Sequence, residues 1–188
     1  KPSKMPGYAY NLPATECKVG AKLVQVPGSV CHGCYALKGR YRFPNVKEAM
    51  HRRLASIQDP LWVETMAADI NARKSKYFRW HDSGDIQSLA HLKKIFDVCK
   101  LTPDVAHWIP TRESGILSKL GPEEVPANLT IRLSATMVDG NAPKNSWHLT
   151  STVVTEGASC PAPKQGNECK SCRNCWDQSI KNIAYGKH

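Results

Sequence analysis

The sequence predicts an α/β fold: a partial, open TIM-like βα barrel of about five or six parallel strands, followed by a cysteine-rich C-terminal extension. Two observations favour it. Strand-like and helix-like segments alternate along most of the chain. The chain has 188 residues, whereas a complete eight-unit barrel takes roughly 250. We expect residues 1–155 to form the barrel domain and residues 156–188 to form the extension, packed on the same domain.

The first third of the chain predicts one short strand and two helices. Residues 7–14 suit a strand that Pro13 ends, and a loop rich in Gly, Val, Pro and Ser follows. Two runs of apolar residues at helical spacing then predict two helices, each with one buried face. These runs are Val46, Met50, Leu54, Ile57 and Trp62, Met66, Ile70. Asp59 and Pro60 predict the start of the second helix, as its N-cap and first residue.

The remainder predicts a repeating βα succession. Residues 77–81 are aromatic and alternating, which is typical of a strand, and Ser88 opens a helix. Cys99 lies on the apolar face of that helix, so we expect it to be buried packing. Further strands are expected at 105–109, 129–134 and 148–154, with a short helix at 115–120. The connections are long enough for right-handed crossovers, which predicts parallel strands.

Chemically active side chains follow the predicted strands. They are Cys17, Cys31 and Cys34, then His81, Asp82 and Asp85, then Thr111, Arg112 and Glu113, then Ser134, Thr136 and Thr152. In α/β barrels the chemistry lies at the carboxyl ends of the strands, so these groups are expected to meet at one end of the molecule. Thr130, Arg132 and Ser134 share one face of their strand, which indicates either a polar ligand pocket in the lumen or simple edge-strand exposure.

Four cysteines near the C-terminus have the spacing of a metal centre. Cys169, Cys172 and Cys175 stand in a C-x2-C-x2-C run, and Cys160 precedes a proline nine residues upstream. This arrangement is typical of ferredoxin-type [4Fe–4S] ligands, although there the Cys-Pro lies downstream. A closed four-thiolate zinc site is the alternative, and disulfides are a third interpretation.

A second group contains only three cysteines, Cys17, Cys31 and Cys34. Three thiolates leave one position of a four-coordinate metal or of a cubane open, as a catalytic centre requires. His32 could supply a fourth ligand, but a histidine beside a ligand cysteine is more often a neighbour. Clustered C-x2-C spacings favour metal binding in a reducing compartment over a disulfide framework. We therefore expect a cytoplasmic protein.

The net charge is +10, which indicates a polyanionic partner such as nucleic acid, or an anionic small molecule. Alternatively, basic residues compensate negatively charged thiolate clusters. Arg52 and Arg53 follow the three-cysteine loop as either a phosphate or carboxylate clamp or a solvated helix face. No run of 18 apolar residues is present, which predicts no membrane span, and no signal peptide is visible.

Four stretches together carry a resemblance. Cys31-His-Gly-Cys34-Tyr-Ala, Phe78-Arg-Trp-His81-Asp-Ser-Gly-Asp85, Asn128-Leu-Thr-Ile-Arg-Leu-Ser134 and the cysteine tail resemble the phage and plasmid "gene product 88" family. The likeness covers nearly the whole chain. It implies a mobile element and a bacterial host cytoplasm rather than a particular activity.

The three-cysteine loop on a partial βα barrel is more distantly similar to the radical S-adenosylmethionine enzymes. That resemblance implies a [4Fe–4S] cluster on three cysteines with one iron free for S-adenosylmethionine, an auxiliary cluster in the C-terminal extension, and an electron donor such as a ferredoxin or flavodoxin. The spacing departs from the usual C-x3-C-x2-C, because this chain has C-x13-C-x2-C. The usual glycine-rich segment is not recognisable, and residues 81–85 could take its place.

Three functions therefore stay open. The first is a redox enzyme with one or two [4Fe–4S] clusters, held by the seven clustered cysteines. In it His81, Asp82, Asp85, Arg112 and Glu113 are expected to be catalytic, and Arg79, Ser83, Arg132 and Ser134 to bind the cofactor. The second is an electron-transfer or structural cluster protein. The third is a basic nucleic-acid-binding protein whose fold is stabilised by a structural zinc or cluster. The two cysteine groups could also share one centre.

Overall fold

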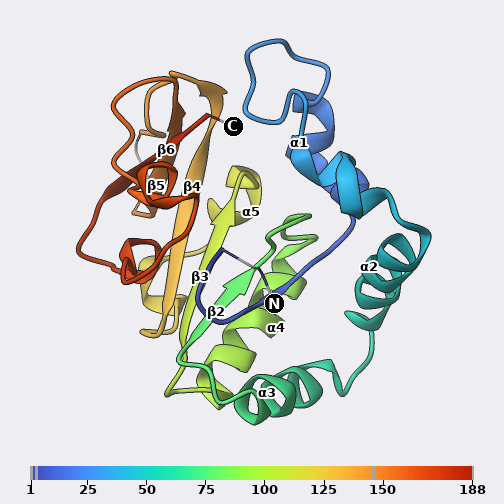
Figure 1. The fold of residues 1–188 in the computed structure, drawn as a ribbon. Coiled ribbons are helices and arrows are strands. Elements are labelled where there is room, and N and C mark those ends of the chain that lie inside the picture. Colours follow the sequence, from blue (N-terminus) through green and yellow to red (C-terminus); the bar gives the residue numbers. More distant parts are fainter. Residues whose placement is uncertain (1, 3, 145–146, 188) are drawn as a thin grey trace.

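A six-stranded, all-parallel sheet runs through the molecule in a computed structural model that describes residues 2, 4–144 and 147–187 (Figure 1). The strands lie side by side in chain order, each paired in parallel with the next. They are β1 (Tyr8–Tyr10), β2 (Tyr77–Trp80), β3 (Ala106–Thr111), β4 (Leu129–Val138), β5 (Leu149–Val154) and β6 (Asn182–Gly186). The sheet does not close, since β1 and β6 are its two edges. The predicted α/β class and parallel strands are confirmed.

Helices connect the first strands and cover one side of the sheet (Figure 1). The α-helices are α1 (Lys18–Leu23), α2 (Pro44–Ser56), α3 (Trp62–Ala72), α4 (Leu89–Leu101) and α5 (Ser114–Leu117). Short 3-10 turns are η1 (Ala14–Glu16), η2 (Tyr35–Leu37), η3 (Gly39–Arg42), η4 (Pro122–Glu124), η5 (Ala162–Gln165) and η6 (Asn174–Trp176). Ser88 caps α4 as expected, because its hydroxyl accepts a hydrogen bond from the His91 backbone N–H.

Several elements and boundaries differ from the sequence-based expectation. Helix α3 begins at Trp62 rather than at Pro60, because the Asp59 carboxylate accepts the Leu61 N–H at 2.8 Å and closes a turn ahead of the helix. The expected loop after Cys17 contains the short helix α1. The tail contributes β6, so residues 156–188 supply the sixth strand of the sheet as well as the cysteine run.

Alternation along β2 divides the sheet into two faces. Phe78 and Trp80 are buried against the helices, in a core that includes Trp62 of α3 and Leu92 of α4. Cys99 is 0% exposed in that core, so its predicted packing role is confirmed. None of the helices among the described residues is long and apolar enough to cross a membrane.

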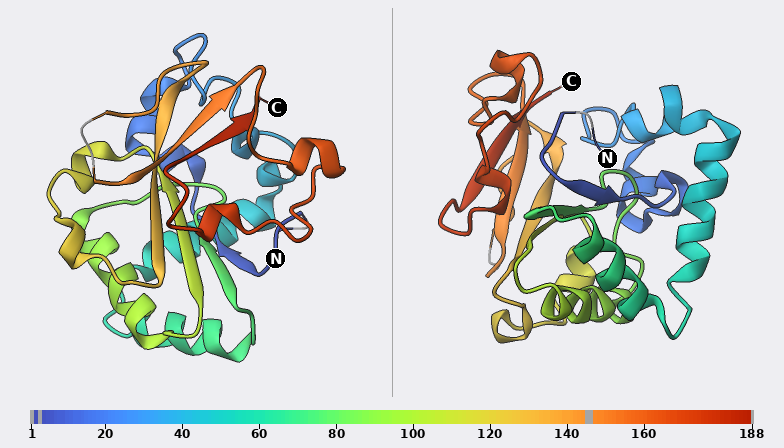
Figure 2. Two further views of the ribbon diagram at one scale, coloured as in Figure 1. Left: turned by 90° about the vertical axis from the view of Figure 1, so that its left-hand side faces the viewer. Right: turned by 60° about the horizontal axis from the view of Figure 1, so that its bottom comes forward.

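The face opposite the helices is covered by the chain's own C-terminal segment (Figure 2). Trp176 packs edge-on against Tyr77 of β2 and Trp108 of β3, and its indole N–H donates to the Phe78 carbonyl at 3.0 Å. Thr130 of β4 donates its hydroxyl to the Trp176 carbonyl. This covering places the cysteine run directly on the sheet.

Candidate functional site

The three cysteines of the N-terminal cysteine group, Cys17, Cys31 and Cys34, lie beyond the carboxyl ends of the strands. Cys17 follows η1 and immediately precedes α1. The loop that carries Cys31 is fastened to β4, because the Val30 N–H donates to the Thr136 carbonyl and the Val138 N–H donates to the Gly28 carbonyl, both at 2.9 Å. The structure therefore brings a loop near the start of the chain against a strand about one hundred residues later.

The sulfurs of Cys17 and Cys31 both lie close to Gly20. A Cβ placed on Gly20 would lie 3.6 Å from each of these two sulfurs and 2.9 Å from the Cys17 Cβ. The two sulfurs are thus no more than about 7 Å apart, since both lie 3.6 Å from that one point. Cys34 belongs to the same group, because its electrostatic interaction with Cys17 and Cys31 contributes to raising the pKa of both.

Two carboxylates from neighbouring strand ends lie beside this group. Glu113, after β3, accepts the backbone N–H groups of Lys18 and Val19 at 3.1 and 3.0 Å, and so holds the first turn of α1. Asp85, after β2, accepts the Thr111 hydroxyl at 2.6 Å and the Arg112 N–H at 2.9 Å. Through these hydrogen bonds, the two carboxylates hold the cysteine loop and the strand ends in position.

Burial governs the protonation of this group. Burial raises the pKa of the Cys17 thiol to about 12, and the negative charge of Asp85 adds to the shift. Burial also raises the pKa of Asp85 to about 6, although its hydrogen bonds from Thr111, Arg112 and Ile86 act in the opposite direction. A thiol of this kind ionises when a cation binds it, because the metal charge stabilises the thiolate.

A second polar centre surrounds Arg79, on the sheet face away from the helices. Its guanidinium lies 4.8 Å from the centre of the Trp108 ring and interacts electrostatically with Tyr35, Asp82 and Tyr185. The Arg79 Nε and the Asp82 Oδ1 are buried and have no hydrogen-bond partner among the described residues. These two atoms are free to bind a polar ligand, because buried polar groups otherwise find partners.

The C-terminal cysteine group consists of Cys160, Cys169, Cys172 and Cys175, and all four line one cavity with Trp176 and Ile183. Main-chain bonds fix its members: the Cys160 N–H donates to Ala184 of β6, and the Cys169 N–H donates to Lys4. The Cys175 sulfur lies 3.2 Å from the Tyr185 hydroxyl. Burial raises the pKa of Cys175 to about 11.

Arg132 of β4 is the anchor of this cysteine run. It is 0% exposed and donates hydrogen bonds only to backbone carbonyls. Four of these belong to the loop after the third clustered cysteine and one belongs to β5; they are Cys175, Asn174, Asp177, Ile180 and Thr150, at 2.7 to 3.4 Å. Arg132 is therefore buried rather than exposed at a strand edge, and the chain's own loop occupies the space in front of it.

The potential ligand side chains lie farther apart than a site for a single metal ion requires. Within the described ranges 4–144 and 147–187, no three His, Cys, Asp or Glu side chains lie close enough together to hold one metal ion. A mononuclear zinc site would need four sulfurs drawn in to about 2.3 Å from one centre. The described arrangement is instead two separate sets of cysteines, of which the C-terminal set lines a cavity and the N-terminal set lies around Gly20.

A family model described as "Gene product 88" matches residues 1–178. The chain belongs to the gene product 88 family. No curated protein and no solved structure matches it. The family assignment carries no activity, so the site of this gene product 88 protein is interpreted from its own residues.

The remaining predicted site residues of the gene product 88 protein have structural partners. Ser83 donates its hydroxyl to the Leu12 carbonyl at 2.6 Å, and Ser134 lies 2.9 Å from the Ser151 hydroxyl. Arg112 donates to the Ala135 carbonyl across 3.4 Å. His81 is 3% exposed and lies on the helix side near Tyr10 and His91, with no hydrogen-bond partner for either ring nitrogen among the described residues.

Sequence reasoning did not single out Gly20 or the tyrosines Tyr35, Tyr41 and Tyr185. Tyr35 donates its hydroxyl to the Asp82 carbonyl, and Tyr41 lies 3.4 Å from the Asp82 carboxylate. The only sequence signal for Tyr35 was its position directly after Cys34. Nothing in the sequence could show that Tyr185, on the last strand, faces Cys175.

Proposed function

We propose that this gene product 88 protein is an iron–sulfur redox enzyme in which the C-terminal cysteine group holds a closed [4Fe–4S] cluster. The N-terminal cysteine group would hold a second cluster with one open coordination position, where S-adenosylmethionine binds. The observation that carries the proposal is the arrangement of seven cysteines as a complete set of four around one cavity and an incomplete set of three at the strand ends.

Gly20 supports the fit of a cluster to the incomplete set. Any side chain at this position would crowd the Cys17 Cβ and contact the Cys17 and Cys31 sulfurs. Gly20 is also buried within a helix, where glycine is otherwise unfavourable by about 1 kcal/mol relative to alanine. A glycine that lets two cysteines approach each other in spite of that cost suits a shared inorganic group.

The strand order supports a barrel-like scaffold for this chemistry. Six parallel strands in chain order are the arrangement of a partial βα barrel, in which active sites lie at the carboxyl ends of the strands. In this interpretation the barrel domain spans residues 1–155, and residues 156–188 are its cluster-binding extension. The enzyme would act in a bacterial host cytoplasm and take electrons from a ferredoxin or flavodoxin.

Arg79 and Asp82 are assigned to bind a cofactor or substrate, because their buried Nε and Oδ1 atoms have no hydrogen-bond partner in the described part of the chain. Arg79 would bind an anionic group and Asp82 a cationic one, which suits a molecule that carries both. His81, Asp85, Arg112 and Glu113 stay predicted catalytic residues, and Ser83, Arg132 and Ser134 stay predicted cofactor ligands. All of these side chains except His81 also make hydrogen bonds in the described part of the chain, which give them positioning roles as well.

Anaerobic purification with iron, sulfide and zinc quantification tests the clusters. We expect about eight irons and eight sulfides per chain and absorption in the visible region from sulfur-to-iron charge transfer, since each cubane contains four irons. A colourless protein that contains only zinc would refute the proposal. S-adenosylmethionine added to the reduced protein is then expected to change the EPR spectrum of one cluster.

An electron-transfer or structural role is the second candidate. It is favoured by the closed surroundings of the C-terminal cysteine group, where Arg132 and Tyr185 fill the positions around Cys175. Eight irons with an EPR spectrum that S-adenosylmethionine leaves unchanged would support this candidate over the enzyme. Zinc as the bound metal would instead support a nucleic-acid-binding protein whose fold is stabilised by a structural zinc site.

A further inference from the structure

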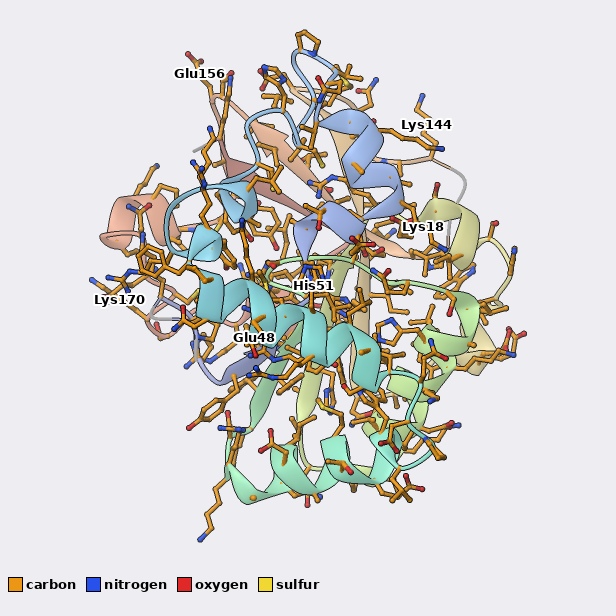
Figure 3. All side chains as sticks on the ribbon, turned by 90° about the vertical axis from the view of Figure 1, so that its right-hand side faces the viewer. Lys18, Glu48, His51, Lys144, Glu156 and Lys170 are labelled. Carbon is orange, nitrogen blue, oxygen red and sulfur yellow. The ribbon has the colours of Figure 1, made fainter. Side chains whose placement is uncertain are left out.

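Residues 35–53 form a strongly basic surface, and α2 within it lies on the side of the molecule away from the C-terminal segment (Figures 1 and 3). We call this stretch, which comprises η2, η3 and nearly all of α2, the basic surface. Residues 38–53 contain six Lys and Arg and one acidic residue, Glu48. Figure 3 looks onto α2 and shows Glu48 and His51 on this helix, whose only fully buried residue is Met50.

The positive charges of the basic surface are mostly not neutralised. The ion pair recorded there joins Arg52 to Glu48. Lys38, Arg40, Arg42 and Lys47 are exposed and form no ion pair with another described residue. On α3 and α4, by contrast, Arg73 and Lys100 pair with carboxylates of their own helices. An unpaired cationic surface of this kind attracts a polyanion.

Two exposed aromatic rings lie among these cations. Tyr35 and Phe43 are each 54% exposed, whereas the aromatic side chains of the hydrophobic core are buried. The Tyr35 ring is held in place because its hydroxyl turns inward and donates to the Asp82 carbonyl. Phe43 stands immediately before α2, between Arg42 and Pro44. Cations together with exposed rings are the two components of single-stranded nucleic-acid sites.

We propose that the basic surface binds single-stranded nucleic acid. Arg40, Arg42 and Lys47 contact phosphates, and bases stack on Phe43 and Tyr35. The binding goes beyond the proposed redox function and needs no cluster chemistry. Binding at this surface brings the nucleic acid to the edge of the candidate site. Tyr35 directly follows Cys34, and the Lys38 ammonium lies 3.4 Å from where a Gly33 Cβ would be.

The test measures binding of fluorescent 20-nucleotide DNA and RNA single strands and of a DNA duplex by anisotropy, over a range of salt concentrations, to the purified full chain. The variants are the triple substitution Arg40→Gln, Arg42→Gln, Lys47→Gln and the single substitution Phe43→Ala. The matched control is Lys119→Gln, Lys144→Gln, Lys181→Gln, which removes the same charge from exposed positions outside the basic surface. Circular dichroism melting verifies that each variant is folded.

We expect the triple variant to bind a single strand at least about tenfold more weakly at low salt, with the slope of log affinity against log salt reduced by about 2, since each lost phosphate contact removes about 0.7. Phe43→Ala is expected to weaken binding by about 5- to 100-fold, and Phe43→Tyr to retain it. The lysine control should bind within about threefold of the parent protein.

Equal losses in the triple variant and the lysine control would overturn the proposal, because binding would then follow net charge alone. Tighter binding of the duplex, with no effect of Phe43→Ala, would also overturn it. Different affinities for the DNA and RNA single strands would identify which nucleic acid the surface prefers.

Discussion

The two cysteine groups of this protein are held in opposite ways. The C-terminal group surrounds one cavity, and the buried Arg132 guanidinium fixes the loop that carries it through backbone carbonyls. The N-terminal group has one cysteine fewer and rests on a loop joined to β4 and to the Glu113 carboxylate. Unpaired polar atoms at Arg79 and Asp82 lie between the two groups.

Under the proposed function, this difference separates an open centre from a closed one. A set of four ligands whose surroundings are already filled suits a closed structural or electron-transferring centre. A set of three ligands, placed at the carboxyl ends of parallel strands near unpaired polar atoms, suits an open centre. The following predictions separate the two groups by perturbing the residue that supports each.

The largest effect is expected from Arg132→Met. The substitution leaves several buried carbonyls without donors, which we expect to lower the free energy of unfolding by about 3 kcal/mol or more. The melting temperature of a chain of this size should fall by roughly 6–12 °C. The metal content of the C-terminal group should fall while that of the N-terminal group persists. Thermal melting and iron analysis measure the two changes.

Arg112→Met is the control for that substitution. Arg112 makes one long side-chain hydrogen bond, to the Ala135 carbonyl, so its removal should cost less than about 1 kcal/mol. Equal destabilisation by the two variants would show that Arg132 does not anchor the C-terminal loop.

Asp85→Asn should change how stability depends on pH. The pKa of Asp85 is raised from 3.8 to about 6 by burial, so the folded protein binds a proton that the unfolded chain has released. The contribution of Asp85 to stability is therefore present in full below about pH 4 and lost as pH rises to about 6, by on the order of 2 kcal/mol. Urea unfolding of metal-free protein between pH 4 and 7 measures this.

The asparagine variant lacks this titration, so its stability relative to the parent should improve between pH 4 and 6. It should still be less stable overall, because an amide NH₂ would face the Arg112 N–H donor. Parallel stability curves for the two proteins would contradict the raised pKa of Asp85.

Gly20→Ala should affect the N-terminal group alone. Its added methyl would enter the space beside the Cys17 and Cys31 sulfurs, so we expect the iron content to fall by about four per chain. Global stability should fall by no more than about 2 kcal/mol, because the overlap of the new Cβ with the Cys17 Cβ, 2.9 Å away, costs about 1–3 kcal/mol and the helix preference of alanine offsets about 1 kcal/mol of it. Gly115→Ala is the matched control, because a Cβ there meets nothing within 4 Å. Unchanged iron in Gly20→Ala would refute the role assigned to this glycine.

The smallest effect on stability is expected from Arg79→Gln. Loss of a cation near Cys175 and Tyr35 should lower the reduction potential of the C-terminal cluster by on the order of tens of millivolts, because a reduced cluster is more negative. Potentiometric EPR titration measures the shift. A potential unchanged from that of the parent protein would mean that the Arg79 charge does not act on this group.

Local patterns in the sequence were sufficient for much of the fold. The apolar stripe of α3 is buried at Trp62 and Ile70, and Ser88 caps α4, because helical spacing and capping depend on neighbours within a turn. The alternation in β2 and β4 identified their strands for the same reason. The short β6 was not recognised, because its pairing with β5 involves residues about thirty positions away.

The residues of the candidate site were predictable by type, but their structural partners were not. Arg132 and Ser134 stay predicted cofactor ligands, and only the structure shows that Arg132 donates to carbonyls of a loop more than forty residues later and that Ser134 lies against Ser151. Gly20 was not singled out, since its importance depends on how close two distant sulfurs approach.

The sequence by itself determined the chemical groups and their spacing. These are seven clustered cysteines in a set of three and a set of four, an excess of positive charge, and the alternation of strands and helices. These properties are encoded in residue type and in short spacings. Only the tertiary structure decided that the set of four lines one cavity anchored by Arg132, and that Gly20 separates two sulfurs of the other set. The reason is physical, because a buried donor or a void is defined by the neighbours that the fold brings together.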